Sequence, residues 1–275
     1  MGKGEALPSL HIANCTLLIS HYIVLIFSKR GEINMLYQII TALVCLAVMV
    51  LAPIFVKEQK NGPCWRSLFV KMVAATGYVA VGLLCAVSTR ACSSFDKLLL
   101  AALALSWIGD LFLHLWQTKV FPVIGFLGFF SAHFFFIAAY LKGIAAFAPD
   151  RGFFSVPEIV FVAAFIVCFV IFAAKTGMNL KGVIAVPIVL YAAVITTMLC
   201  KATVLGVAAV QAGAAHGGWI LVCALAGALL FVASDFTISI LMFNEKHKKN
   251  YPLKMFNIVT YFAAELLLAL LIALV

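Results

Sequence analysis

Long apolar runs separated by short polar breaks dominate the hydropathy pattern of this chain. The runs are about 20 residues long and lack the strict alternation of apolar and polar residues that marks a membrane-spanning β-strand. A run of this length makes a helix that can cross the hydrocarbon core of a bilayer. The pattern predicts eight spans, at residues 36–56, 68–88, 97–116, 121–141, 155–174, 182–202, 217–243 and 254–275.

The breaks between these runs are short, and charged and turn-forming residues coincide in them. Segments 57–63 and 244–252 are examples, because each combines lysines with glycine or proline. Connections this short require consecutive helices to be antiparallel, which predicts an up-and-down bundle. Segment 203–216 consists of small and weakly polar residues, and we interpret it as a loop.

The first 35 residues form an N-terminal extension to this pattern. Residues 10–28 are moderately apolar, include His11, Asn14 and His21, and end at Lys29 and Arg30. They predict either a ninth span or a helix lying at the membrane interface, and we favour a span. A cleaved signal peptide is disfavoured because no small-x-small cleavage site follows the run.

Composition supports a membrane protein and excludes a soluble domain. Hydrophobic residues make up 65% of the 275 residues and charged residues only 11%, with a mean hydropathy of +1.17. Such a chain cannot provide a charged surface, so lipid is its natural solvent. The predicted fold is an all-α polytopic transmembrane bundle, with one domain at 36–275 after the extension at 1–35.

The net charge of +9 points to lipid headgroups and not to nucleic acid. The 19 lysines and arginines are spread over nearly every connection, as expected of helix ends that face headgroups. With eight spans, the side that holds the 57–67 and 244–253 connections collects 11 of them, counting Lys71 and Lys254 at the span ends, and the opposite side collects 8, which predicts that the first side is cytoplasmic. The eight cysteines occur singly, without the paired spacing of a metal site, and we expect free thiols.

Three acidic residues, Asp110, Asp235 and Glu265, lie inside predicted spans. An acid in a span costs about 3 kcal/mol or more, so it normally faces a partner or a cavity. Both aspartates lie a few turns from the same membrane surface, and Tyr261 approaches from that side. We therefore predict one polar pocket that opens to one face and to the lipid, with Lys71 near its entrance.

Other polar residues in the spans have ordinary interpretations as well. His133 is a buried candidate for carrying a proton or for hydrogen bonding, whereas Lys71 could simply extend to the interface. His114 follows Asp110 by one turn, a spacing that could hold a metal, but at a span end we favour a histidine facing headgroups. Gly227 predicts close helix packing ahead of Asp235.

At these residues the sequence resembles the YhhN family of integral membrane proteins, the lysoplasmalogenases. The resemblance covers roughly residues 36–275 and rests on four blocks. They are LALSWIGDLFLHL at 103–115, GFFSAHFFFIAAY at 128–140, AGALLFVASDFTISILMF at 226–243 and NIVTYFAAELLLAL at 257–270. Asp110 and Asp235 match the aspartates of the family pattern, and Lys71 resembles its lysine. Tyr261 is retained, but Glu265 stands where the family typically has glutamine.

The resemblance implies an enzyme that hydrolyses the vinyl ether bond of lysoplasmalogens. The products would be a fatty aldehyde and a glycerophospho-ethanolamine or -choline. Asp110 and Asp235 would be catalytic, one as general acid and the other ionised to stabilise the cation and activate water. The residues expected to bind substrate are Lys71, His133, Tyr191, Tyr261 and Glu265. No metal or cofactor is expected.

The same implication sets the expected partners and location. The lysophospholipid would enter sideways from the bilayer, with its phosphate near Lys71 and its chain among the phenylalanines. Membrane lipids would be the only other partners, and the oligomeric state is left open. The membrane would be the bacterial inner membrane, or the endoplasmic reticulum or plasma membrane in a eukaryote.

Three other functions compete with this reading. A proton-coupled transporter would use buried acids and a histidine, although no internal repeat marks one here. A metal-dependent lipid hydrolase would bind zinc through Asp110, His114, His133 and Asp235. A structural or sensor protein would use the acids only to fix helix packing.

Overall fold

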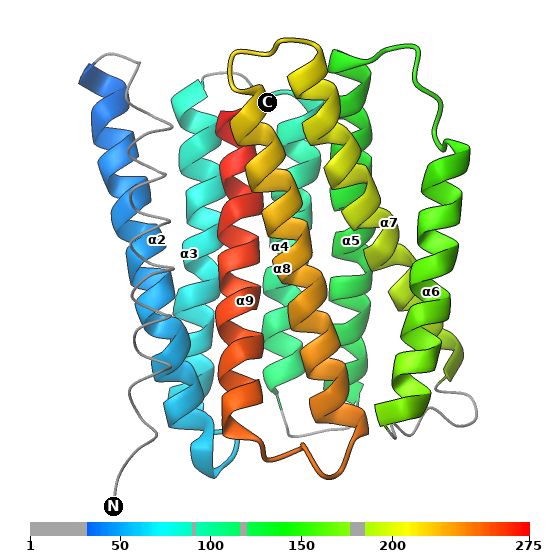
Figure 1. The fold of residues 1–275 in the computed structure, drawn as a ribbon. Helices are drawn as coiled ribbons and strands as arrows, with labels where there is room; N and C mark the ends of the chain where they lie inside the picture. Colours follow the sequence, from blue (N-terminus) through cyan, green and yellow to red (C-terminus); the bar gives the residue numbers. More distant parts are fainter. Residues whose placement is uncertain (1–31, 90–91, 116–119, 177–184) are drawn as a thin grey trace, which may run out of the picture.

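Eight long helices run side by side in the computed structural model, which describes residues 32–89, 92–115, 120–176 and 185–275 (Figure 1). They are α2 (Glu32–Glu58), α3 (Trp65–Thr89), α4 (Ser94–His114), α5 (Val120–Phe147), α6 (Val156–Thr176), α7 (Ala185–Gln211), α8 (Gly217–Phe243) and α9 (Tyr251–Leu270). Short 3₁₀ turns, Gln59–Asn61 and Leu271–Ala273, follow α2 and α9. All eight long helices have the length and apolar composition needed to cross a membrane, which confirms the all-α polytopic bundle. The candidate span at 10–28 lies outside the described residues.

Side-chain caps mark the starts of α4 and α9. The side chain of Ser93 accepts a hydrogen bond from the backbone N–H of Asp96 at 3.1 Å, and the Asp96 carboxyl accepts one from the N–H of Ser93 at 2.8 Å. This reciprocal pair satisfies two backbone donors at the start of α4. Asn250 caps α9 in the same way, by accepting from the N–H of Leu253. Polar residues in the breaks therefore fix the helix ends.

The prediction of a loop at 203–216 is wrong over most of its length, because α7 continues to Gln211. Small residues there allow close packing and do not end the helix. A Cβ on Gly206 would lie only 2.5 Å from the Cα of Leu221, so α7 and α8 touch backbone to backbone at this point. Leu205 and Ala209 are fully buried on the same stretch. Tertiary packing thus extends a segment whose composition alone is ambiguous.

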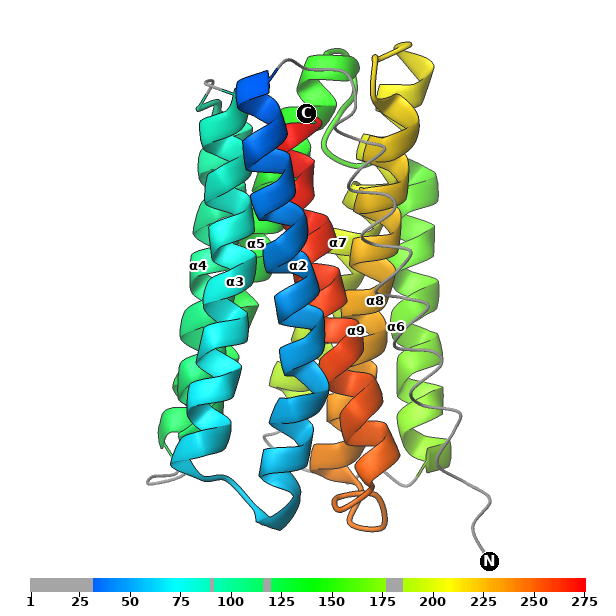
Figure 2. The same cartoon turned by 90° about the vertical axis from the view of Figure 1, so that its left-hand side faces the viewer.

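The most buried helix is α9, the last long helix of the chain. It packs against α2, α3, α4 and α8, and Figure 2 shows it between α2 and α8. In contrast, α6 packs mainly on α7 and reaches α8 through the rings of Phe165, Phe169 and Phe172, which contact Phe236. Much of α6 is exposed and apolar, as a lipid-facing helix should be.

Glycines allow the helices that carry the two aspartates to approach their neighbours closely. On α5, a Cβ at Gly125 would lie 2.6 Å from the backbone nitrogen of Leu113, and one at Gly128 would lie 3.0 Å from that of Gly109. On α8, a Cβ at Gly227 would lie 2.7 Å from the side chain of Leu268, which confirms the predicted packing role. These contacts hold α4 on α5 and α8 on α9.

An ion-pair cluster joins α6 to α7 towards the end of the bundle where α6 begins and α7 ends. The Glu158 carboxylate pairs with the buried ammonium of Lys201 and, at 2.9 Å, with the guanidinium of Arg151. Lys201 also donates to the carbonyl of Phe153, and its ammonium lies over the ring of Phe154. These contacts satisfy two buried charges within the protein, so we assign the cluster a structural role.

Candidate active site

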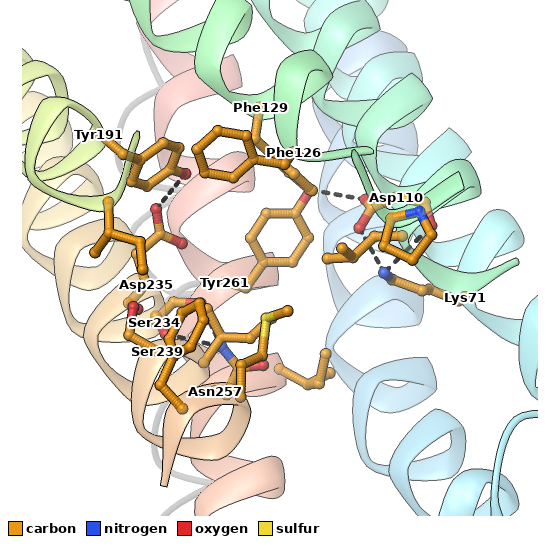
Figure 3. Close-up of a pocket in the computed structure, with 17 residues that line it drawn as sticks. Lys71, Asp110, Phe126, Phe129, Tyr191, Ser234, Asp235, Ser239, Asn257 and Tyr261 are labelled. Carbon is orange, nitrogen blue, oxygen red and sulfur yellow. Dashed lines mark hydrogen bonds and ion pairs between the residues drawn. The ribbon is translucent and has the colours of Figure 1, made fainter. Parts of the chain in front are cut away.

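A pocket of about 140 Å³ lies near the end of the bundle where α4 and α8 end and α5 and α9 begin (Figure 3). This is the end that carries the α2–α3 and α8–α9 connections (Figure 1). Asp110 lies four residues from the end of α4, and Asp235 lies eight from the end of α8. The polar residues that line the pocket are Lys71, Asp110, Tyr191, Ser234, Asp235, Ser239, Asn257 and Tyr261. One pocket therefore brings the two aspartates together, on the side predicted from the sequence.

Asp110 is surrounded by hydrogen-bond donors. The ammonium of Lys71 lies 2.9 Å from its Oδ1 atom. The hydroxyls of Tyr261 and Tyr78 donate to its Oδ2 atom at 2.7 and 3.0 Å. Lys71 is buried, so the alternative that it extends to the interface is wrong: its charge is compensated by Asp110 inside the bundle.

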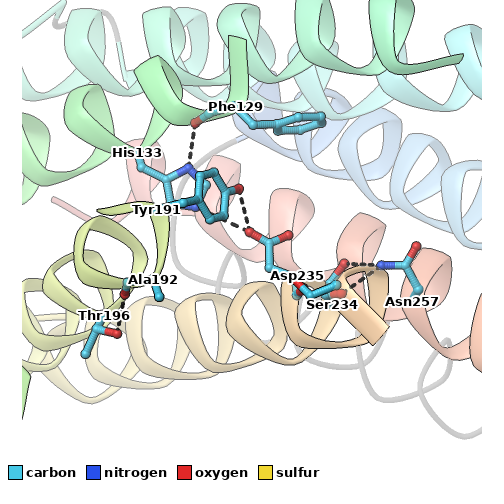
Figure 4. Close-up of polar contacts among 9 residues, drawn as sticks. Phe129, His133, Tyr191, Ala192, Thr196, Ser234, Asp235 and Asn257 are labelled. Carbon is cyan, nitrogen blue, oxygen red and sulfur yellow. Dashed lines mark hydrogen bonds and ion pairs between the residues drawn. The ribbon is translucent and has the colours of Figure 1, made fainter. Parts of the chain in front are cut away.

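Asp235 has a different environment across the pocket. The hydroxyl of Tyr191 donates to its Oδ2 atom at 2.6 Å, and Nε2 of His133 lies 3.7 Å from the same oxygen (Figure 4). The other ring nitrogen of His133, Nδ1, lies 2.7 Å from the carbonyl oxygen of Phe129. Two helices, α5 and α7, thus supply the groups around this carboxyl of α8.

A hydrogen-bonded pair on α8 and α9 completes the polar wall. The Nδ2 atom of Asn257 donates to the backbone carbonyl of Ser234 at 2.8 Å and lies 2.9 Å from its hydroxyl (Figure 4). Ser234 precedes Asp235, and Asn257 lies one turn before Tyr261 on α9. This pair fixes α8 and α9 relative to one another, next to Asp235 and Tyr261.

Aromatic and aliphatic side chains form the rest of the pocket. Phe126 contacts the ring of Tyr191 and Phe129 that of Tyr261, with centroids 5.1 and 5.8 Å apart. Ile238 and Met242 continue the apolar wall towards the end of α8. The Met242 side chain is half exposed, so this wall reaches the outside of the bundle. The combination of an apolar wall with convergent polar groups is typical of a ligand site.

Glu265 is fully buried but is not among the residues that line the pocket. It lies one turn after Tyr261 on α9. Neither carboxyl oxygen makes a hydrogen bond of normal geometry in the described structure. The structure therefore places Glu265 behind the pocket, next to the residues that form its wall.

The structure brings most of the predicted site residues together. Lys71, Asp110, Tyr191, Asp235 and Tyr261 all line the pocket, and His133 reaches it through Asp235. Tyr78 was not predicted, although it lies two helical turns after Lys71 and therefore on the same face of α3. Asn257 was not predicted either, although it lies one turn before Tyr261 and therefore on the same face of α9.

The interpretation of His114 as a headgroup-facing residue is wrong. Its side chain is buried, Nε2 lies 2.9 Å from the hydroxyl of Ser67, and its ring packs against Phe55. The close packing of α3 on α4 encloses this helix end. Among the described residues, no group of three or more histidine, cysteine, aspartate or glutamate side chains is arranged to hold a metal.

Comparison with known proteins identifies the family. No curated protein and no solved structure matches the chain. A family model described as the YhhN family matches residues 67–272, which is about three quarters of the sequence. The matched region includes every residue named above as lining the pocket. This multi-pass membrane protein therefore belongs to the YhhN family.

Proposed function

We propose that this protein is a lysoplasmalogenase, which hydrolyses the vinyl ether bond of alkenyl lysophospholipids. The products are a fatty aldehyde and a glycerophospho-ethanolamine or -choline. One observation carries the proposal: the carboxyls of Asp110 and Asp235 line one pocket inside a membrane-spanning bundle. Membership of the YhhN family supports it, because the sequence resemblance implied this activity.

Cleavage of a vinyl ether requires an acid and an anion in one site. Protonation of the β-carbon converts the C=C–O group into an oxocarbenium ion, which water then captures. The acid has to hold its proton at neutral pH, and the anion has to stabilise the developing positive charge. A largely buried site favours both, because electrostatic interactions are strong where water is excluded.

The pocket also fits the amphiphilic form of the substrate. Its volume of about 140 Å³ holds only the segment around the reacting bond, so the remainder of the lipid has to lie outside it. The apolar wall of Phe126, Ile238 and Met242 leads to the exposed face of α8, where an alkenyl chain would remain in lipid. Ser234 and Asn257 provide polar groups for the glycerol side of the bond.

Aldehyde release from a purified alkenyl lysophospholipid tests the proposal. Asp110→Asn and Asp235→Asn should each lower kcat by about 10²-fold or more, because general acid–base groups typically contribute that much. Asp150→Asn is the matched control, since Asp150 is an exposed residue of the α5–α6 connection. Activity should persist in the presence of a chelator.

Substrate controls make the result specific. A lysophospholipid with a saturated alkyl ether should not be cleaved, because it has no β-carbon to protonate. The proposal is wrong if the wild-type protein releases no aldehyde from the alkenyl substrate. It is also wrong if Asp110→Asn and Asp235→Asn both turn over as fast as Asp150→Asn.

A further inference from the structure

The two carboxyls of the pocket differ in their compensation by positive charge. Asp110 has the Lys71 ammonium at 2.9 Å and accepts hydrogen bonds from two tyrosines. All three partners are donors, and the side chain is 1% exposed. A carboxylate in such surroundings is compensated as an anion, and its oxygens need no proton of their own.

Asp235 has no comparable cation. In the part of the chain that the structure describes, no lysine or arginine lies within 4.0 Å of its carboxyl, and its neighbours are Tyr191 and His133. Its side chain is 16% exposed, against 1% for Asp110, so it is the more accessible carboxyl. Burial of an uncompensated anion is costly, and a carboxyl in this position avoids the cost by keeping a proton.

The geometry of His133 indicates which group would face that proton. A carbonyl oxygen only accepts hydrogen bonds, so the contact of 2.7 Å with Phe129 places a hydrogen on Nδ1. In the neutral ring, Nε2 then carries a lone pair and lies 3.7 Å from Oδ2 of Asp235, beyond hydrogen-bond distance, so this buried nitrogen makes no hydrogen bond in the described structure. A lone pair facing an ionised carboxylate is repulsive, whereas a proton on the Asp235 carboxyl removes this repulsion and provides a donor for Nε2 when the two groups approach.

We infer that Asp235 is the general acid, that its proton faces Nε2 of His133, and that Asp110 stays ionised throughout the reaction. The inference rests on the proposed function for the reaction itself. Asp235 is then a catalytic residue that contacts substrate, and His133 is a positioning residue that acts through Asp235. Lys71 acts through Asp110, because it holds this second carboxyl as an anion.

The reaction balances with these roles. The carboxyl of Asp235 gives its proton to the β-carbon, so a C–H bond forms, the C=C π bond breaks, and an oxocarbenium ion faces two carboxylates. Water adds to the carbon bonded to oxygen, and its proton returns to the Asp235–His133 pair. The resulting hemiacetal transfers its hydroxyl proton to the ether oxygen as the C–O bond breaks. Aldehyde and alcohol leave, and the enzyme regains its starting state.

Infrared spectroscopy without substrate tests the resting state. Protein is labelled with ¹³C in the aspartate side-chain carboxyls, which separates aspartate bands from those of Glu265. The C=O stretching band of a protonated aspartic acid should be present in the wild type and in Asp110→Asn, and absent in Asp235→Asn. A wild type without this band, or a band lost in Asp110→Asn and kept in Asp235→Asn, overturns the inference.

His133→Gln tests the positioning role. Loss of the imidazole should shift the Asp235 band, because the group that faces its carboxyl has changed, and should lower kcat about tenfold or more with little change in KM. An unshifted band or a change in KM alone overturns the role of His133. Because the band is measured without substrate, it can be present even if the protein releases no aldehyde, so failure of the proposed function is distinguishable from failure of this inference.

Discussion

The ion pair between Lys71 and Asp110 is buried, and its two members depend on each other. Lys71→Met removes the cation and leaves a carboxylate with only hydroxyl donors. Removing one partner of a buried pair typically costs about 3–5 kcal/mol, because the remaining charge is uncompensated. We therefore expect Lys71→Met to lower the thermal unfolding midpoint in detergent strongly, and to abolish aldehyde release.

A double variant separates charge balance from packing. Lys71→Met combined with Asp110→Asn removes both charges, so most of the lost stability should return while activity stays absent. Lys97→Met is the control, because Lys97 is an exposed lysine of α4 and its loss should change stability by less than about 0.5 kcal/mol. If the double variant were no more stable than Lys71→Met, the loss of stability in Lys71→Met would not come from the uncompensated charge of Asp110.

At the same scale, the sequence revealed the charged members of the site but not their hydroxyl and amide partners. Asp110 and Asp235 stand out because an acid in an apolar span is costly, and counting residues to the helix ends places both at one surface. Tyr78 and Asn257 cost less to bury and occur in many apolar helices. Their helical spacing from Lys71 and Tyr261 placed them on the right faces, but only the fold shows which hydroxyl reaches which carboxyl.

Helix α5 depends on two glycines for its position against α4. Gly125→Ala would place a methyl group 2.6 Å from the backbone nitrogen of Leu113, and this backbone cannot move without displacing the helix end that carries Asp110. Overpacking of this kind typically costs about 1–3 kcal/mol. We expect a lower unfolding midpoint, together with reduced kcat because Asp110 shifts relative to Lys71.

Gly218→Ala is the matched control for this substitution. Gly218 is also helical, near the start of α8, but a Cβ there has no neighbouring atom within 4 Å. Alanine is the better helix former, so this variant should be as stable as the wild type or slightly more stable. Equal unfolding midpoints for the two variants would show that the α4–α5 contact is not tight.

The elements themselves were largely predictable from the sequence. Eight apolar runs of spanning length gave eight helices, because lipid leaves a spanning segment little alternative to a helix. The end of α7 was not predictable, since the segment after Lys201 is neither strongly apolar nor broken by proline. Its helical state depends on Gly206 packing against α8, a contact between segments that only the fold brings together.

The pocket lies near one end of the bundle, and the distribution of lysine and arginine predicts which side of the membrane this end faces. The pocket lies near the α2–α3 and α8–α9 connections, on the side that collects 11 of the 19 basic residues. The positive-inside rule predicts that this side is cytoplasmic. Cys64 in the α2–α3 connection and Cys92 in the α3–α4 connection mark the two ends of the bundle, and both are at least partly exposed.

Thiol labelling in sealed vesicles tests this orientation. Variants that keep only Cys64 or only Cys92 are treated with a membrane-impermeant maleimide. In right-side-out vesicles Cys92 should react and Cys64 should not, and inside-out vesicles should give the reverse. A hydrogen bond with the side chain of Ser67 lowers the pKa of the Cys64 thiol, so more thiolate is present at neutral pH and labelling there should be fast. Labelling of Cys64 in right-side-out vesicles would instead place the pocket at the non-cytoplasmic face of the membrane, and the water for the proposed hydrolysis would come from that side.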